Sequence, residues 1–151
     1  GKVEKTFSIK AKKGTKFTVG AYKYKIINQS EVAFAGIKSA KTKRVSIPKT
    51  AKIGGKKFKV TSIAARALKN KKITSVTVGA NVRSIGAEAF YNCKKLSAIK
   101  IKSIRLKSVG RNAFKGIKPT AAINVPKKKL RAYRKLLKGK GQGRKVKIRS
   151  R

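Results

Sequence analysis

The chain has 151 residues, and its 44 lysines and arginines are accompanied by only three acidic residues, all glutamates, so its formal net charge is +41. Internal ion pairs cannot neutralise this charge, and we therefore expect counterions or a polyanion around the folded chain. The lack of histidine and aspartate disfavours general acid–base enzymes, while the single cysteine excludes an internal disulfide framework and a cysteine metal cluster.

Residues 1–36 are predicted to form a β-structured cap at the start of a single domain. The segment 16–28, KFTVGAYKYKIIN, contains two apolar runs separated by Gly-Ala, which is typical of a β-hairpin. The segment 31–37, EVAFAGI, adds a further strand. We expect an antiparallel sheet of these strands to cover the first layer of the structure that follows, because stacked strands leave an open end that needs a cap.

An unusual sequence motif occurs twice in the middle of the chain. Residues 73–95 read ITSVTVGANVRSIGAEAFYNCKK, and residues 96–118 read LSAIKIKSIRLKSVGRNAFKGIK. The apolar positions of the two copies correspond at a period of about 23 residues, with one residue inserted in the second copy. A degenerate earlier copy occupies 44–48 and 60–68, and a partial later copy occupies 121–130.

This period predicts a solenoid of three or four turns, each with one short parallel strand and a return segment. Neither part can bury its apolar side alone, whereas stacking places the Ile, Val and Phe positions in a continuous column. Phe90 and Phe114 are expected to fill this column from the return side. Gly86 and Gly110 lie where the chain turns sharply, which predicts either a positive φ or a close approach of two backbones.

The stretch 49–59, KTAKIGGKKFK, separates the two parts of the degenerate first copy. Its Gly-Gly pair lies between two short runs that contain apolar residues. This pattern predicts a small β-hairpin inserted into the first turn.

The run VTVGANVRSIGAEAFYNCKKL resembles the BspA-like leucine-rich repeat, whose consensus pairs an I-G-x-x-A-F turn with a following Cys and Leu. The resemblance covers about residues 37–126, although the first copy has Ala64 in place of Gly and Leu68 in place of Phe. It implies an α/β leucine-rich-repeat solenoid, right-handed, with a parallel sheet on one face, and we assign the repeats to 37–120. It further implies a secreted or surface-attached bacterial protein that binds or adheres rather than catalyses.

Residues 121–151 are predicted to form a helical cap followed by a basic tail. The run 126–139, PKKKLRAYRKLLKG, is the best helix candidate, with Pro126 suited to the first turn and Gly139 to the C-terminal stop. Its apolar residues form one stripe, which consists of Leu130, Tyr133, Leu136 and Leu137. A glycine-rich turn and a short strand through Val146 and Ile148 are expected to follow.

Residues that could suggest a catalytic or phosphate-binding role are better explained by structural roles. Glu88 occupies a position that is Asn112 in the second copy, so we expect a surface residue or an ion-pair partner. Cys93 corresponds to Ile117 and has no histidine to activate it, which predicts a buried free thiol. The run GKGQG lacks the spacing of a phosphate-binding loop and is interpreted as a turn. We expect no catalytic residue, metal site, cofactor or small-molecule substrate.

The dense positive charge predicts non-specific, salt-sensitive binding to polyanions through release of their counterions. Lysines outnumber arginines more than three to one, which favours attraction between point charges over bidentate recognition. No helix-turn-helix or zinc-finger pattern appears, and the four tyrosines are too scattered to form a stacking platform. The candidate contacts are Lys100, Lys102, Lys128, Lys129, Arg131, Arg134, Lys135, Arg144, Lys145, Lys147, Arg149 and Arg151.

The partners that this charge permits are teichoic acid, sulfated glycan, mucin, DNA, RNA and anionic membrane surfaces. We favour a monomeric, secreted or cell-surface bacterial protein, with no signal peptide within the chain itself. The alternatives are an intracellular protein that binds nucleic acid non-specifically and a cationic membrane-active protein that uses the terminal helix. An enzyme is the least favoured hypothesis.

Overall fold

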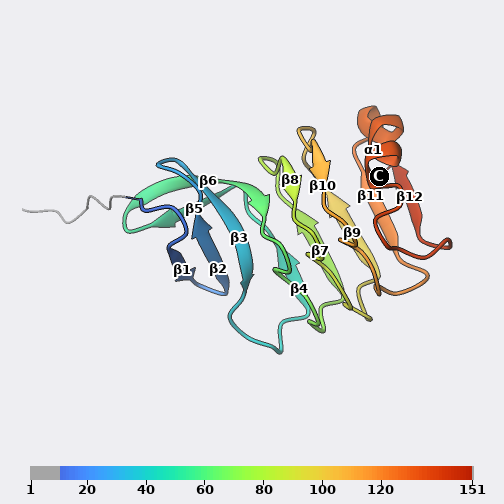
Figure 1. The fold of residues 1–151 in the computed structure, drawn as a ribbon, viewed down its shortest axis with the longest axis horizontal. Coiled ribbons are helices and arrows are strands. Elements are labelled where there is room, and N and C mark those ends of the chain that lie inside the picture. Colours follow the sequence, from blue (N-terminus) through green and yellow to red (C-terminus); the bar gives the residue numbers. More distant parts are fainter. Residues whose placement is uncertain (1–10, 151) are drawn as a thin grey trace, which may run out of the picture.

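The computed structural model describes residues 11–150, and in it the strands are stacked along one axis, with one short helix near the C-terminal end (Figure 1). One sheet has the strand order β1-β2-β3-β6-β8-β10, with β5 also paired to β6, and the other has the order β12-β11-β9-β7-β4. The chain therefore forms a solenoid of about five turns, which confirms the predicted fold class. Within the described residues, no helix is long and apolar enough to span a lipid bilayer.

The N-terminal cap consists of three strands. β1 (Lys16–Val19) and β2 (Tyr22–Ile26) form the predicted hairpin, and β3 (Glu31–Ile37) lies antiparallel to β2. β3 also pairs in parallel with β6, so it joins the cap to the solenoid. The ring of Tyr24 meets the buried ring of Phe34 edge-on, with centroids 6.3 Å apart, and this contact anchors the cap in the core.

The predicted insertion forms a second hairpin. β5 (Thr50–Ile53) lies antiparallel to β6 (Lys56–Ile63), and both Gly54 and Gly55 in the connecting turn have positive φ. Beyond the hairpin, β6 continues to Ile63 and pairs in parallel with β8, so the insertion extends from the solenoid without interrupting it.

Two parallel ladders hold the turns together, where the resemblance implied one. The longer ladder consists of β4 (Arg44–Ser46), β7 (Ser75–Val78), β9 (Ala98–Ile101), β11 (Ala122–Val125) and β12 (Lys147–Ser150). The other is made by the end of β6 with β8 (Ser84–Ile85) and β10 (Ser108–Val109). The prediction of three or four turns was too low, because β12 completes a further turn after the helix.

Inward-facing residues of the longer ladder form the core column. Val76, Ile99 and Ile123 occupy the same register and are almost completely buried. Phe90 and Phe114 fill the column from the return side and are also fully buried. The predicted hydrophobic column is therefore confirmed.

Gly86 and Gly110 are required because two backbones approach closely. A Cβ atom on Gly110 would lie 2.3 Å from the backbone nitrogen of Ala87, and one on Gly86 would lie 2.4 Å from that of Ala65. Neither glycine has a positive φ; Glu88, two residues after Gly86, has the left-handed conformation instead. Of the two explanations that the sequence left open, close approach is correct.

The C-terminal cap begins with a tight 3₁₀ turn, η1 (Lys127–Lys129), and continues as α1 (Leu130–Leu137). Tyr133 and Leu137 face the core and are buried, which confirms the predicted apolar stripe. After the helix, the chain re-enters the stack, because the amide of Phe114 donates a hydrogen bond of 3.0 Å to the carbonyl oxygen of Lys140. This bond repeats the one between consecutive earlier turns, where Phe90 donates to Ala113.

Candidate functional site

The outer face of the longer ladder brings together cations that lie far apart in the sequence. Side chains alternate along β9, so Lys100 projects outward between the buried Ile99 and Ile101. The register aligns Lys100 with Asn124 of β11, and Asn124 with Arg149 of β12. Arg149 donates a hydrogen bond of 3.0 Å from Nε to Oδ1 of Asn124, which fixes its guanidinium above the sheet.

A shallow hollow of about 580 Å³ lies beside this row. Four of its lining residues are cations from β12 and the loop before it: Arg144, Lys145, Lys147 and Arg149. The other three, Ser97, Thr120 and Ala122, are small and lie at the starts of β9 and β11, which leaves room for an anionic group to approach the sheet beside the cations. We call Lys100, Arg144, Lys145, Lys147 and Arg149 the sheet-face cations.

The predicted helix cations do not join this face as one group. Arg134 hydrogen-bonds the carbonyl oxygen of Ile148 through Nη2 and Nε, at 3.3 and 3.4 Å, and so covers an outward-facing group of edge strand β12. Lys128 lines a separate hollow together with Lys102. The remaining predicted helix cations are Lys129, which is half-buried, and the exposed Arg131 and Lys135. Arg151 lies outside the described residues.

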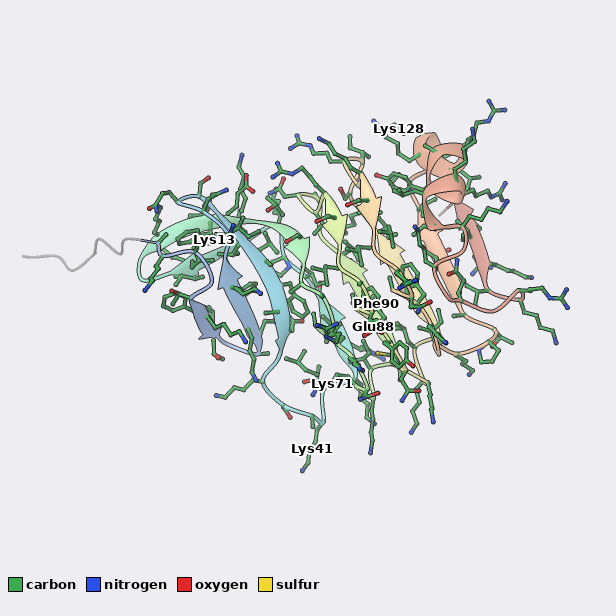
Figure 2. All side chains as sticks on the ribbon, viewed as in Figure 1. Lys13, Lys41, Lys71, Glu88, Phe90 and Lys128 are labelled. Carbon is green, nitrogen blue, oxygen red and sulfur yellow. The ribbon has the colours of Figure 1, made fainter. Side chains whose placement is uncertain are left out.

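A second cationic region was not predicted. Lysines gather at the corner where each return segment leads into the next strand, and we call this set the lysine corner: Lys41, Lys43, Lys71, Lys72, Lys94 and Lys95. They line two adjoining hollows of about 500 and 210 Å³, which share Asn70, Lys71 and Lys72. Lys41 and Lys71 project from the same edge of the stack (Figure 2).

The lysine corner has an ordered backbone beneath it. Asn70 and Asn92 occupy equivalent left-handed positions in consecutive turns, and Asn92 donates a hydrogen bond of 2.9 Å from Nδ2 to Oδ1 of Asn70. The sequence did contain a signal for this corner, because the repeats place the pair Lys71–Lys72 and the pair Lys94–Lys95 at the same point of the turn.

Both glutamates in the described part of the chain are engaged in ion pairs. Glu88 lies 3.6 Å from Arg66 and 3.8 Å from Lys69, which confirms its predicted role. Glu31 accepts hydrogen bonds from Arg83 at 2.8 Å and from the hydroxyl of Thr61 at 3.0 Å. Burial opposes ionisation of Glu31, but these hydrogen bonds and the Arg83 charge outweigh it and hold its pKa below the usual range.

Cys93 is a buried free thiol, as predicted. Its side chain has no exposed surface, and its Sγ donates a hydrogen bond of 2.9 Å to the carbonyl oxygen of Leu68. Burial raises the pKa of the Cys93 thiol to about 11. Within residues 11–150, no group of three or more potential metal ligands comes together.

All four tyrosines lie within the described residues, and they take part in packing contacts. Tyr24 and Tyr133 are buried, and burial raises the pKa of Tyr24 to about 12. The hydroxyl of Tyr22 accepts a hydrogen bond of 2.7 Å from the amide of Ser46. The Tyr91 ring has the ammonium group of Lys69 5.1 Å from its centroid.

Comparison with known proteins identifies one family. A family model described as a BspA type leucine rich repeat region, in six copies, matches residues 61–149, which is more than half of the chain. The match begins and ends later than the interval 37–126 that carries the sequence resemblance. No curated protein sequence matches the chain.

Three crystal structures of bacterial proteins resemble this one. A leucine rich cell surface protein from Faecalibacterium prausnitzii is 27% identical, with a TM-score of 0.60, and the match covers 74% of this chain but only 33% of that protein. A leucine-rich repeat protein from Bacteroides capillosus is 22% identical, with a TM-score of 0.66, over 88% of this chain and 97% of that one. A leucine-rich repeat protein from Bacteroides ovatus is 20% identical, with a TM-score of 0.57, over 89% of this chain and 41% of that one. This chain therefore spans about a third of the length of the first of these proteins.

Proposed function

Because this chain belongs to the BspA-type leucine-rich repeat family, we propose that it is a non-catalytic binding protein that attaches to anionic polymers. The observation that carries this proposal is the register of β9, β11 and β12, which aligns Lys100 and Arg149 on one outward face of a rigid sheet. The engagement of Glu31 and Glu88 in ion pairs supports a binding role over acid–base catalysis.

The proposed mode of attachment is electrostatic. A linear polyanion carries condensed counterions, and each cation that contacts it releases some of them, which makes binding favourable and strongly dependent on salt. Neighbouring strands are about 4.8 Å apart, so Lys100 and Arg149, which lie two strands apart in the ladder, are about 10 Å apart along the stack. Lysine dominates the charge, and its flexible stem suits many polymers rather than one sequence or sugar.

We further propose that the protein acts at the surface of a bacterial cell. The support is the similarity to the Faecalibacterium prausnitzii protein, which is described as a cell surface protein and is 27% identical over 74% of this chain. Teichoic acid, sulfated glycan and mucin are polyanions that such a location would offer. The membrane-active alternative has less support, because Tyr133 and Leu137 of the terminal helix are buried in the core.

The proposal can be tested by measuring affinity for heparin, a sulfated glycan, across a salt series. The plot of log affinity against log salt should be steep and linear. In the triple variant Lys100→Gln, Lys147→Gln, Arg149→Gln, the slope should fall by about two to three, because each phosphate or sulfate contact contributes close to one.

A matched control removes three exposed lysines from the N-terminal cap: Lys12→Gln, Lys16→Gln and Lys23→Gln. This variant carries the same net charge, so its slope should fall by clearly less than that of the sheet-face variant. Equal losses in the two variants would show that only total charge matters, and a flat salt plot for the unmodified chain would refute polyanion binding.

The intracellular alternative predicts a preference for nucleic acid. A competition titration between DNA and heparin at equal charge density separates the two hypotheses. We expect no preference for DNA, because no base-reading element or stacking platform was found in the sequence. A strong preference for DNA or RNA would favour the alternative.

A further inference from the structure

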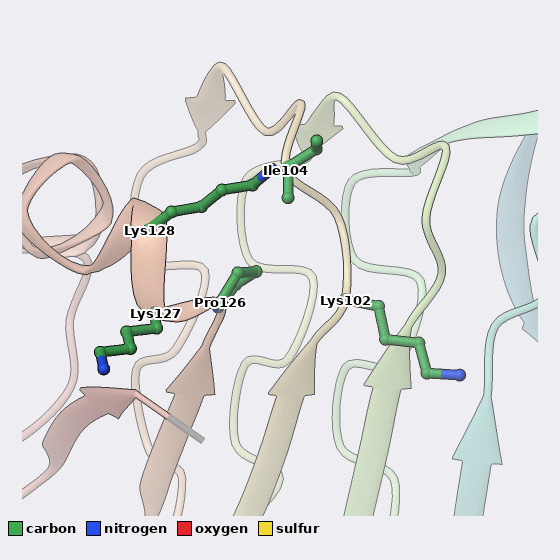
Figure 3. Close-up of a pocket in the computed structure, with 5 residues that line it drawn as sticks. All are labelled: Lys102, Ile104, Pro126, Lys127 and Lys128. Atoms are coloured by element: carbon green, nitrogen blue, oxygen red, sulfur yellow. The ribbon is translucent and has the colours of Figure 1, made fainter.

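A hollow of about 810 Å³ lies at the C-terminal ends of β9 and β11, and unlike the hollows beside the sheet-face cations and at the lysine corner it is lined by a large apolar side chain. It combines two apolar residues, Ile104 and Pro126, with the three cations Lys102, Lys127 and Lys128. Figure 3 shows the side chain of Lys128 extending toward Ile104, with Lys102 and Lys127 on opposite flanks. A surface that binds its partner only through charge would not need these two apolar residues.

The exposure of Ile104 is unusual in this protein. It is 42% exposed, and no other large hydrophobic side chain within residues 11–150 has comparable exposure. Exposing an isoleucine forgoes part of the stabilisation that burial of such a side chain contributes. The residue stands in the segment where the second repeat has one more residue than the first.

Hydrogen bonds fix the chain on both sides of Ile104. Before it, Ser103 is buried, and its Oγ donates a bond of 2.6 Å to the carbonyl oxygen of Val82. The Tyr133 hydroxyl donates a bond of 2.8 Å to the carbonyl oxygen of Ser103. After it, the amide of Leu106 donates a bond of 3.0 Å to the same hydroxyl. The segment that contains Ile104 is therefore fixed on both sides of this residue.

We propose that this hollow binds an acidic peptide segment of a partner protein, in which one large apolar side chain is flanked by carboxylates. The apolar side chain would contact the exposed Ile104, beside the largely buried Pro126, and the carboxylates would pair with the flanking lysines. An apolar centre with a charged rim is the usual arrangement of a protein interface. Because the backbone around Ile104 is already fixed, this segment loses little conformational entropy when the partner binds.

Charge complementarity and shape favour this occupant over two others. A polymer that carries only charge would gain nothing from Ile104. A lipid surface is bound by apolar groups that project into it in number, whereas this site offers one isoleucine within a hollow. The site goes beyond the proposed attachment to polyanions and does not depend on it.

The test compares two acidic peptides that differ only in their central residue. One has two glutamates on each side of a leucine, and the other has alanine in place of the leucine. Fluorescence anisotropy with the full chain should show that the leucine peptide binds roughly fivefold tighter. Raising the salt concentration should weaken both peptides while leaving their ratio unchanged, because salt screens charges and not the apolar contact.

Substitutions in the hollow show which of its residues cause the difference in affinity between the two peptides. Ile104→Ser should remove the difference between the peptides without changing heparin binding, and it should lower the melting temperature only slightly, since the residue is 42% exposed. Ile104→Thr, which keeps the branched Cβ, should leave an intermediate difference. The triple variant Lys102→Gln, Lys127→Gln, Lys128→Gln should weaken both peptides several-fold more than the control Lys52→Gln, Lys57→Gln, Lys59→Gln, which removes the same charge from the β5–β6 hairpin.

Equal affinity for the two peptides would overturn the proposal, and so would a difference that survives in Ile104→Ser. Binding to vesicles of anionic phosphatidylglycerol that depends on Ile104, without discrimination between the peptides, would assign the hollow to a lipid surface instead. Loss of heparin binding in the sheet-face variant leaves the peptide result unaffected, so the two proposals fail separately.

Discussion

The rings of Phe90 and Phe114 are stacked, with centroids 5.5 Å apart and an angle of only 6° between their planes. The two residues hold the same position in consecutive repeats, and both are fully buried. The amide of Phe90 donates a hydrogen bond of 2.8 Å to the carbonyl oxygen of Ala113, the neighbour of Phe114. The two copies of the repeat are therefore layered directly on each other, and each ring packs against the next turn.

The substitution Phe90→Ala should lower the free energy of unfolding by about 3–5 kcal/mol, because it removes a large buried ring and leaves a cavity. Urea unfolding measures this value, with Phe90→Leu as a milder control. Since the rings touch, the cost of the double variant with Phe114→Ala should differ from the sum of the single costs. A loss below about 1 kcal/mol for Phe90→Ala would contradict the stacked column.

The substitution Gly110→Ala should destabilise the fold by about 1–3 kcal/mol, because the new Cβ would lie 2.3 Å from the backbone nitrogen of Ala87. Gly143 provides the control, since nothing lies within 4 Å of a Cβ at that position. Thermal unfolding should show a lower melting temperature for Gly110→Ala and little change for Gly143→Ala. Similar melting temperatures for the two variants would argue against close packing of the turns.

The substitution Glu31→Gln should destabilise the fold at pH 7 by about 1 kcal/mol, since it removes a charged partner from Arg83, whose side chain is 44% exposed. The pKa of Glu31 is lowered in the folded chain from its ordinary value of 4.5. Its contribution is therefore complete above pH 4.5 and is lost as the pH falls through the folded-state pKa.

Urea unfolding at pH 7 and at pH 3 checks this dependence. The difference in unfolding free energy between the unmodified chain and Glu31→Gln should shrink at the lower pH. A difference that stays constant between the two conditions would mean that the carboxylate charge of Glu31 does not contribute to stability.

The substitution Tyr133→Phe should cost about 1–3 kcal/mol, because it leaves the carbonyl oxygen of Ser103 and the amide of Leu106 without their buried partner. Amide hydrogen exchange should become faster at Leu106 than in the unmodified chain. Exchange at Ile99, in the middle of the sheet, serves as the internal reference. Unchanged exchange at Leu106 would show that the hydroxyl does not hold this segment.

Cys93 should resist thiol reagents in the folded protein, since the reactive form is the thiolate and burial raises the pKa of this thiol to about 11. At pH 8, modification by iodoacetamide should be very slow in buffer and rapid in urea. Mass spectrometry measures both rates. Rapid modification without urea would mean that the turn around Cys93 opens readily.

Much of the fold could be predicted from local patterns. The period of the repeats and their apolar spacing identified the column that contains Ile99 and Phe114, because inward positions recur at fixed intervals along the chain. The hairpins formed by 16–28 and by the Gly-Gly insertion were predicted from turn residues next to strand residues. The terminal helix was predicted from its apolar stripe and its Pro and Gly boundaries.

The fifth turn and the second ladder could not be predicted in this way. Ile148 aligns with Ile123 across an intervening helix, and the two-residue strands β8 and β10 are too short to leave a pattern. The role of Gly110 also depended on the neighbouring turn, because only the stacked structure shows the backbone of Ala87 beside it. These features arise from contacts between segments that are distant in the sequence.

The sequence by itself determined the repeat, the column of Ile, Val and Phe, and a net charge that internal pairs cannot neutralise, because composition and period are local properties. Only the tertiary structure decided which cations act together. Strand register aligned Lys100 with Arg149 through Asn124, whereas Arg134 was directed to a carbonyl oxygen of β12. The tertiary structure also left Ile104 exposed, in a segment that hydrogen bonds to residues far along the chain fix on both sides of it.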